Sequence, residues 1–361
     1  MKKQASRSSQ RRVFIILLLI SIGWNTAFAL AGIWKDFWLA GVIGNFLIIA
    51  IIAERLRNTL PPRYAMAYER GLSIAFPALL LLSWEILVRE HLLNPRWFPP
   101  PSQVLAALWE LCTQYDKFTK TSLLGRPWLI PQHWTQAGAK GVLMLFRESH
   151  LLATIYRVLA GFIFGAIPGI LIGVLMGINR TIRLMLDATM SAIYVLPKIA
   201  IFPIMMLIFA NPFGEAPKIA VVAIGSFFLV AINTMAGVRD IAPVYFESGK
   251  NYGANRWQMF WHIIVPGALP VIFAGLRLAL GTAIITTVAI EFVRAKEGAG
   301  YLILYYWEVM IPEKMYAALV VVMLLGFVFN AGLAAFEKWM MPWKRDEQAI
   351  RRDHREQGTT S

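Results

Sequence analysis

Lys198 is the ionisable residue whose surroundings point most directly to a chemical role. It lies in a long apolar stretch between Pro197 and Pro203, and proline rings leave backbone groups without their helical partners. Inside an apolar layer, irregular backbone and charge are tolerated beside protein or a water-filled path. The Lys198 amine could therefore bind an anionic solute, or it could reach the lipid interface or a carboxylate such as Asp187.

Two further charges, Arg277 and Glu291, lie inside another apolar stretch. They are fourteen residues apart, about 21 Å on one helix, so they cannot pair with each other. Each is expected to have a partner on another helix, with gating or solute contact as the alternative. Arg157 begins its own apolar stretch and is expected to extend outward as an anchor. The candidate residues along a solute path are Pro197, Lys198, Arg277 and Glu291.

The sequence holds no pattern that is typical of catalysis. No His, Cys and carboxylate residues have the spacing of metal ligands, and no Ser/His/Asp set stands out. Gly249-Lys250 lacks the upstream glycine and the following Ser or Thr of a phosphate-binding loop. The single cysteine, Cys112, cannot form an intrachain disulfide. We expect no catalytic residues, no metal and no cofactor on this chain.

The composition predicts an all-α polytopic membrane protein. Of 361 residues, 58% are hydrophobic and 16% charged, with 35 Lys+Arg against 21 Asp+Glu and a net charge of +14. Such a composition excludes a disordered chain and does not fit an ordinary soluble enzyme. The basic residues collect between long apolar runs, which indicates membrane lipids rather than nucleic acid as the surroundings.

About eight apolar runs are long enough to cross a bilayer, which needs about 20 residues of helix. The first two form a tight hairpin, and the fifth is interrupted by Pro197 and Pro203. The predicted spans are residues 13–33, 37–53, 72–88, 158–178, 184–211, 219–238, 269–293 and 315–336. A cleavable signal peptide is the alternative for the first run, because Ala27-Phe28-Ala29 resembles a cleavage site.

Lys and Arg are concentrated in alternate connections, which places both termini in the cytoplasm. The segment 89–153 then lies outside. Ser102 is expected to cap an amphipathic helix that begins at Gln103, and the stretch 114–140 is expected to be a loop.

Glycine recurs at every fourth position of the fourth predicted span. This step places the glycines along one helix face, where another helix can approach backbone to backbone. Packing within the helix bundle is the expected role, and lining a solute path is the alternative. The five residues are Gly161, Gly165, Gly169, Gly173 and Gly177.

The segment 239–266 is too long for a turn and too apolar for a linker. Pro243 suits the first turn of a helix, Gly253 suits a left-handed stop, and Asn255 with Gln258 resembles a capping box. Two short cytoplasmic helices joined at a glycine are therefore expected. They would present an aromatic surface for a partner protein, made of Phe246, Tyr252, Trp257, Phe260 and Trp261.

This segment resembles the EAA loop of ABC importer permeases, which docks into the ATPase subunit. The residues that carry the resemblance are Glu247, Ser248, Gly249, Gly253, Ala254, Trp257, Phe260 and Pro266. The glycine repeat and the stretches on either side of this segment are similar to the nitrate/sulfonate/taurine/bicarbonate-type branch of the family. The stretches are Leu196-Pro197, Ile201-Phe202-Pro203, residues 275–281 with Glu291, and Gly298-Ala299-Gly300-Tyr301. Ser248 and Gly249 replace two alanines of the signature, which favours a more flexible loop but still permits close approach.

The resemblance covers residues 72–343 and implies a permease core of six helices. An N-terminal tail with a two-helix hairpin (1–71) and a charged cytoplasmic tail (344–361) lie outside it. It implies an importer subunit of the bacterial inner membrane that moves a small anionic solute, with ATP and Mg on a partner ATPase. A solute-binding protein and a second permease copy, as a homodimer, are the other implied partners. An ATP-independent secondary transporter and a membrane scaffold are the alternatives.

Overall fold

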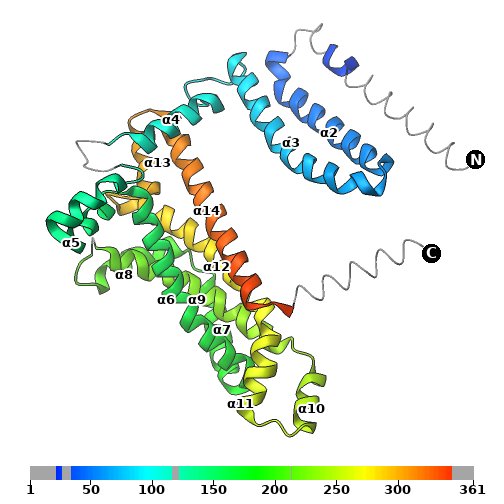
Figure 1. The fold of residues 1–361 in the computed structure, drawn as a ribbon, viewed down its shortest axis with the longest axis vertical. Coiled ribbons are helices and arrows are strands. Elements are labelled where there is room, and N and C mark those ends of the chain that lie inside the picture. Colours follow the sequence, from blue (N-terminus) through cyan, green and yellow to red (C-terminus); the bar gives the residue numbers. More distant parts are fainter. Residues whose placement is uncertain (1–21, 27–33, 116–121, 213, 344–361) are drawn as a thin grey trace, which may run out of the picture. The chain divides into compact units, whose positions relative to one another are not determined.

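The computed structural model describes residues 22–26, 34–115, 122–212 and 214–343. The chain forms two compact units, residues 1–106 and 107–361. Apart from one isolated bridge between Ser122 and Ser149, the regular structure in the described ranges is helical (Figure 1).

Six described helices are long and apolar enough to cross a membrane, and a bent helix pair makes a seventh candidate span. These seven correspond to the predicted spans from residue 37 onward. The predicted span 13–33 lies outside the described residues except for a helical turn at 22–26. The six helices are α2 (Trp34–Thr59), α3 (Pro62–Arg89), α6 (His150–Ile178), α9 (Glu215–Arg239), α12 (Val265–Arg294) and α14 (Pro312–Met340).

In the first unit, α2 and α3 form a hairpin. Between the predicted spans 37–53 and 72–88, α2 continues to Thr59 and α3 begins at Pro62, so most of this polar stretch is helical. The Tyr68 hydroxyl donates to the Ala53 carbonyl at 2.9 Å, which joins the two helices within this stretch. Hydropathy marks where an apolar run ends, whereas a helix continues through polar residues until its backbone is interrupted.

The expected cap at Ser102 is also wrong. Helix α4 (Pro101–Thr113) begins one residue before Ser102. The Ser102 backbone N–H and hydroxyl instead donate to the Glu85 carboxylate, at 3.0 and 2.8 Å. The carboxylate near the end of α3 thus holds the first turn of α4.

The expected loop 114–140 is helical from Pro127 onward. A short 3₁₀ turn (Pro127–Leu129) leads into α5 (Ile130–Arg147), and Gly138 kinks this helix with a φ of +57°. Pro131 sits in the first turn, where a missing N–H costs nothing. The glycine and proline residues that indicated a loop therefore mark the start and the bend of a helix.

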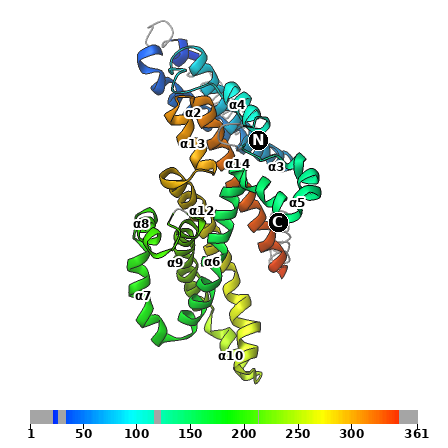
Figure 2. The ribbon, with the colours of Figure 1, turned by 90° about the vertical axis from the view of Figure 1, so that its left-hand side faces the viewer.

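The second unit is built around α6 and α9, which run parallel. The five glycines of α6 face α9: a Cβ at Gly161 would meet Val222, and one at Gly177 would meet Val238. Helix α12 runs antiparallel to α9 and packs beside it, with Gly237 against Val271. Figure 2 shows α6, α9 and α12 together in a second view.

Replacing Gly165 by alanine should destabilise the protein by about 1–3 kcal/mol, because the added methyl group forces the helices apart. A Cβ there would lie 2.2 Å from the Ala223 carbonyl oxygen. The matched control is Gly332→Ala in α14, where no atom lies within 4 Å of the added Cβ. We expect the melting temperature in detergent to fall for Gly165→Ala and not for Gly332→Ala. Equal melting temperatures would show that α6 and α9 do not need this close approach.

The proline-containing span is two helices. Helix α7 (Arg180–Tyr194) and α8 (Lys198–Ile208) meet at a bend of 102°. Pro197 occupies the N-cap position of α8. The bend therefore falls immediately before Lys198, so that this residue begins a helix and does not lie in the middle of one.

Candidate functional site

The segment 239–266 has the local structure that its sequence predicts. Helix α10 (Pro243–Asn251) ends before Gly253, which has a φ of +74°. The Asn255 and Gln258 side chains each accept from the other's backbone N–H, at 2.8 and 2.9 Å, and form a capping box at the start of α11 (Arg256–Met259). The two helices joined at a glycine are confirmed.

The second of these helices differs from the expectation because it does not end in the loop. A π-helical turn (Phe260–Ile264) joins α11 directly to α12. The Val265 N–H bonds to the Phe260 carbonyl, five residues back, and this wider turn accommodates Pro266, which has no N–H to donate. The continuous α11–α12 helix thus extends from the bundle to the Gly253 turn.

Part of the expected aromatic surface is exposed. Tyr252 is 92% exposed and Trp257 is 69% exposed, and Trp257 packs on Trp261 with ring centroids 5.7 Å apart. Phe246 and Phe260 instead pack against the core of the second unit. These two side chains face inward because α10 and α11 each pack one face against the end of the helix bundle.

Gly249 permits α10 to lie against α11. A Cβ at this position would be 2.5 Å from the Met259 Sδ and 2.7 Å from the Ile263 Cδ1. Gly249 is buried, whereas Glu247 and Ser248 beside it are exposed. The close approach of α10 to α11 explains why this position holds a residue without a side chain.

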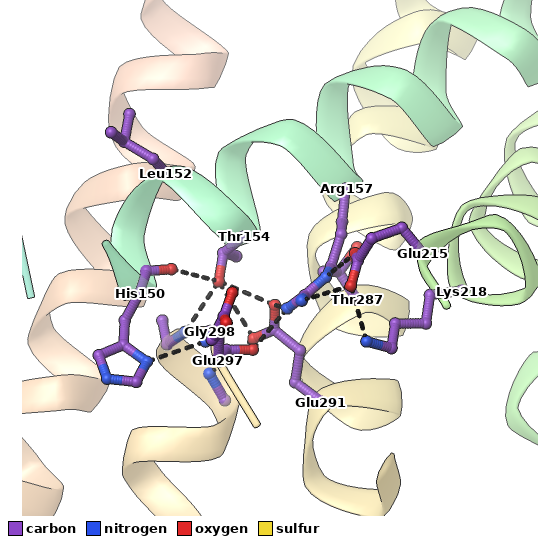
Figure 3. Close-up of polar contacts among 12 residues, drawn as sticks. His150, Leu152, Thr154, Arg157, Glu215, Lys218, Thr287, Glu291, Glu297 and Gly298 are labelled. Carbon is purple, nitrogen blue, oxygen red and sulfur yellow. Dashed lines mark hydrogen bonds and ion pairs between the residues drawn. The ribbon is translucent and has the colours of Figure 1, made fainter. Parts of the chain in front are cut away.

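A buried ionic cluster lies at the opposite end of the second unit (Figure 3), and Arg157 is its centre. The expected outward anchor is wrong: Arg157 is 2% exposed. Its guanidinium donates to Glu215 of α9 at 2.9 Å and to Glu291 of α12 at 2.8 Å. A further bond runs to the Glu297 carbonyl at 2.6 Å. Arg157 turns inward because carboxylates from two other helices converge on it.

Glu291 is enclosed by donors from two elements, α6 and the helix that follows α12. Besides Arg157, the Thr154 hydroxyl lies 2.9 Å from its Oε1 and the Gly300 N–H donates to its Oε2 at 2.8 Å. A Cβ at Gly298 would lie 2.3 Å from the Glu291 Cδ. Gly298 also has a φ of +130°. Glycine is therefore required where the backbone wraps this carboxylate.

The same cluster holds the start of α13 (Ala299–Glu308). The Gly298 N–H donates to His150 Nδ1 at 3.0 Å, and the Ala299 N–H donates to the Thr154 hydroxyl at 2.8 Å. These bonds satisfy N–H groups at a helix start that has no side-chain cap of its own. The cluster fixes α6, α9, α12 and α13 to one another.

The candidate path residues are not brought together. Arg277 bonds to Glu337 of α14 at 2.7 Å, so each of Arg277 and Glu291 has a partner on another helix. The Lys198 amine donates to the Tyr194 carbonyl at 3.0 Å and lies 4.6 Å from the centre of the Tyr194 ring. Within the described residues, no group of three or more His, Cys, Asp and Glu could hold a metal ion.

Sequence reasoning missed Thr154, Glu215 and Lys218. Glu215 follows Asn211-Pro212-Phe213-Gly214, a polar gap between two apolar runs. The signal that could have found them is the spacing of Glu215 and Lys218, three residues apart at the start of a span. Charges at the ends of other spans could then have been considered as their partners.

Comparisons with known proteins agree with this architecture. Residues 169–342 match the family described as binding-protein-dependent transport system inner membrane component. The aliphatic sulfonates transport permease protein SsuC of Escherichia coli is 31% identical over 68% of this chain and 90% of its own length. The taurine transport system permease protein TauC of the same organism is 29% identical over 82% of this chain and 99% of its own. The inward-facing MetNI methionine ABC transporter aligns with a TM-score of 0.47 at 16% identity, over 59% of this chain and 96% of that one.

The chain belongs to the binding-protein-dependent permeases, the membrane-spanning subunits of ABC importers. Within them it is of the taurine and sulfonate type. It is a multi-pass inner-membrane transporter component, and its family implies an ATPase and a solute-binding protein as partners.

Proposed function

We propose that this permease imports a small anionic solute, such as an organic sulfonate, as a homodimer. The observation that carries the solute class is the similarity to permeases of taurine and aliphatic-sulfonate transport over most of the chain. ATP and Mg are bound by the partner ATPase, and the permease converts its movement into alternating access.

The surface for the ATPase is formed by α10, the Gly253 turn and α11. It is exposed, aromatic and mounted on a helix continuous with α12. Large exposed aromatic side chains are typical of protein interfaces. A movement of the Gly253 turn would be transmitted to the bundle along the continuous α11–α12 helix.

Both termini lie in the cytoplasm in this proposal. Met341, just after α14, is 1% exposed and belongs to the core cluster against which Phe246 and Phe260 pack. The end of α14 therefore shares a core cluster with the helices that we assign to the ATPase. The buried ionic cluster then lies toward the outer face.

Lys198 contributes to the solute path. Among the described residues, its amine contacts a backbone carbonyl and a ring face. Its stem lies against Gly225 of α9, where a Cβ would be 3.3 Å from the Lys198 Cγ. An amine without a carboxylate among these contacts retains its attraction for a passing anion.

Replacing Lys198 by glutamine should lower sulfonate uptake about tenfold, because one favourable charge–charge contact is lost. Uptake of a labelled sulfonate in cells lacking their own sulfonate permease measures this effect. Lys198→Arg should retain most of the activity, and Lys314→Gln, which removes an amine bonded to Glu110 at 2.6 Å, is the control. Unchanged uptake in Lys198→Gln would show that Lys198 does not contribute to the solute path. Failure of the unsubstituted chain to transport any sulfonate would refute the proposed solute class.

A further inference from the structure

A half-buried carboxylate covers two buried cations at the α13 end of the second unit. The cations are Arg157, 2% exposed, and Lys218, 5% exposed. The carboxylate is Glu215, whose side chain is 41% exposed. In Figure 3, Glu215 lies between the two cations, while Glu291 lies on the other side of Arg157.

Both cations contact the same carboxylate. Glu215 Oε1 lies 2.9 Å from Arg157 Nη2 and 2.9 Å from Lys218 Nζ. Its other oxygen, Oε2, accepts from Arg157 Nε. This arrangement is a bidentate guanidinium contact extended by an ammonium group, which is the donor set that proteins use for oxyanions.

The charges balance only while Glu215 is in place. Arg157 and Lys218 are matched by Glu215 and by Glu291, whose side chain is fully buried. Glu291 cannot leave, because Thr154, Arg157 and Gly300 enclose it. Without Glu215, the cluster would hold one uncompensated positive charge in a largely buried place, and such a site attracts an anion strongly.

We propose that Arg157 and Lys218 form a binding site for a singly charged oxyanion of the sulfonate class, and that the Glu215 carboxylate occupies this site until the solute displaces it. Two of the three sulfonate oxygens can replace the two carboxylate oxygens. Glu215 is the first residue of α9, so its side chain is free of a preceding helical turn. The inference rests on the proposed function for the identity of the anion.

The position of Lys218 relative to Lys198 supports this site. Gly225, which contacts the Lys198 stem, is two helical turns beyond Lys218 on the same face of α9, about 10 Å along the axis. An anion that leaves Arg157 and Lys218 would next meet Lys198. The two sites would form consecutive steps from one end of α9 toward its middle.

The test is titration of ethanesulfonate into the purified chain in detergent micelles at fixed ionic strength. Glu215→Gln should bind ethanesulfonate about tenfold more tightly than the unsubstituted chain, because the competing carboxylate is gone. Lys218→Gln added to it should reverse the gain. Glu148→Gln, which removes a carboxylate bonded to Arg126 at 2.8 Å, is the matched control and should not change the affinity.

The proposal is overturned if Glu215→Gln binds no more tightly than the unsubstituted chain, or if Lys218→Gln leaves the gain intact. It is also overturned if phosphatidylglycerol in the micelle competes with ethanesulfonate, because the occupant is then a lipid headgroup.

A second measurement applies if Glu215→Gln is poorly folded in detergent. Glu215→Cys, with Cys112→Ser, removes the carboxylate and leaves a thiol beside both cations; it is modified in native membranes by methanethiosulfonates carrying either a sulfonate or a trimethylammonium group. The sulfonate reagent should react about tenfold faster beside Arg157 and Lys218. Equal rates would contradict an anion site. Neither the titration nor the thiol modification requires ATP or transport. A failure of the proposed importer function can therefore be told apart from a failure of the anion site.

Discussion

Replacing Gly253 by aspartate is expected to abolish association with the ATPase subunit while leaving the helix bundle intact. Gly253 has a φ of +74°, and no atom lies within 4 Å of a Cβ built on it. The substitution therefore causes no clash inside the chain. It places a charge at the turn between α10 and α11, beside the exposed Tyr252 and Trp257, where an unpaired charge in an interface costs several kcal/mol.

Copurification of the ATPase with the tagged permease from mild detergent measures this effect. The control is Gly253→Asn, which keeps the size of aspartate, has no charge and tolerates the left-handed conformation. We expect wild-type melting temperatures for both variants and retained ATPase for the asparagine variant alone. Wild-type recovery of the ATPase with Gly253→Asp would show that the partner docks elsewhere.

Removing the guanidinium of Arg157 should be the most destabilising change in the helix bundle. Arg157→Ala leaves the fully buried Glu291 without its cation and also frees Glu215 and the Glu297 carbonyl. Loss of one partner from a buried ion pair costs about 3–5 kcal/mol. The expected result is low recovery from membranes and a much lower melting temperature.

Arg57→Ala is the matched comparison. Arg57 of α2 also pairs with a glutamate of another helix, Glu69 of α3, at 2.7 Å, but both side chains are at least half exposed and lie in the polar stretch between two spans. Solvent-exposed pairs contribute about 0–1 kcal/mol, so this variant should remain stable. If Arg157→Ala and Arg57→Ala lose stability equally, burial of the cluster is not what holds its helices together.

Much of the bundle could be predicted from sequence because a membrane helix is marked by an apolar run within its own sequence. Each described span coincides with an apolar run, and the α10–Gly253–α11 motif follows from proline, glycine and a capping box within sixteen residues of one another. Ends of helices were harder: α2 and α3 extend into polar residues that still satisfy their backbone hydrogen bonds. Helix α5 was missed because Gly138 bends it without ending it.

The ionic cluster could not be predicted because its members are distant in sequence. Arg157 meets Glu291 across 134 positions and Glu215 across 58. Read alone, Arg157 and Lys218 resemble charges that mark the ends of spans. Only the packing of α6 and α12 against α9, which the glycines permit, places them around shared carboxylates.

Reconstituted transport tests the central claim most directly, namely that this chain is the membrane path of an ATP-driven importer. The permease, its ATPase and the solute-binding protein are placed in liposomes, and accumulation of a labelled sulfonate is followed with ATP on the ATPase side. The account predicts accumulation that requires both ATP and the binding protein and disappears with Gly253→Asp. Equal accumulation without ATP would contradict it.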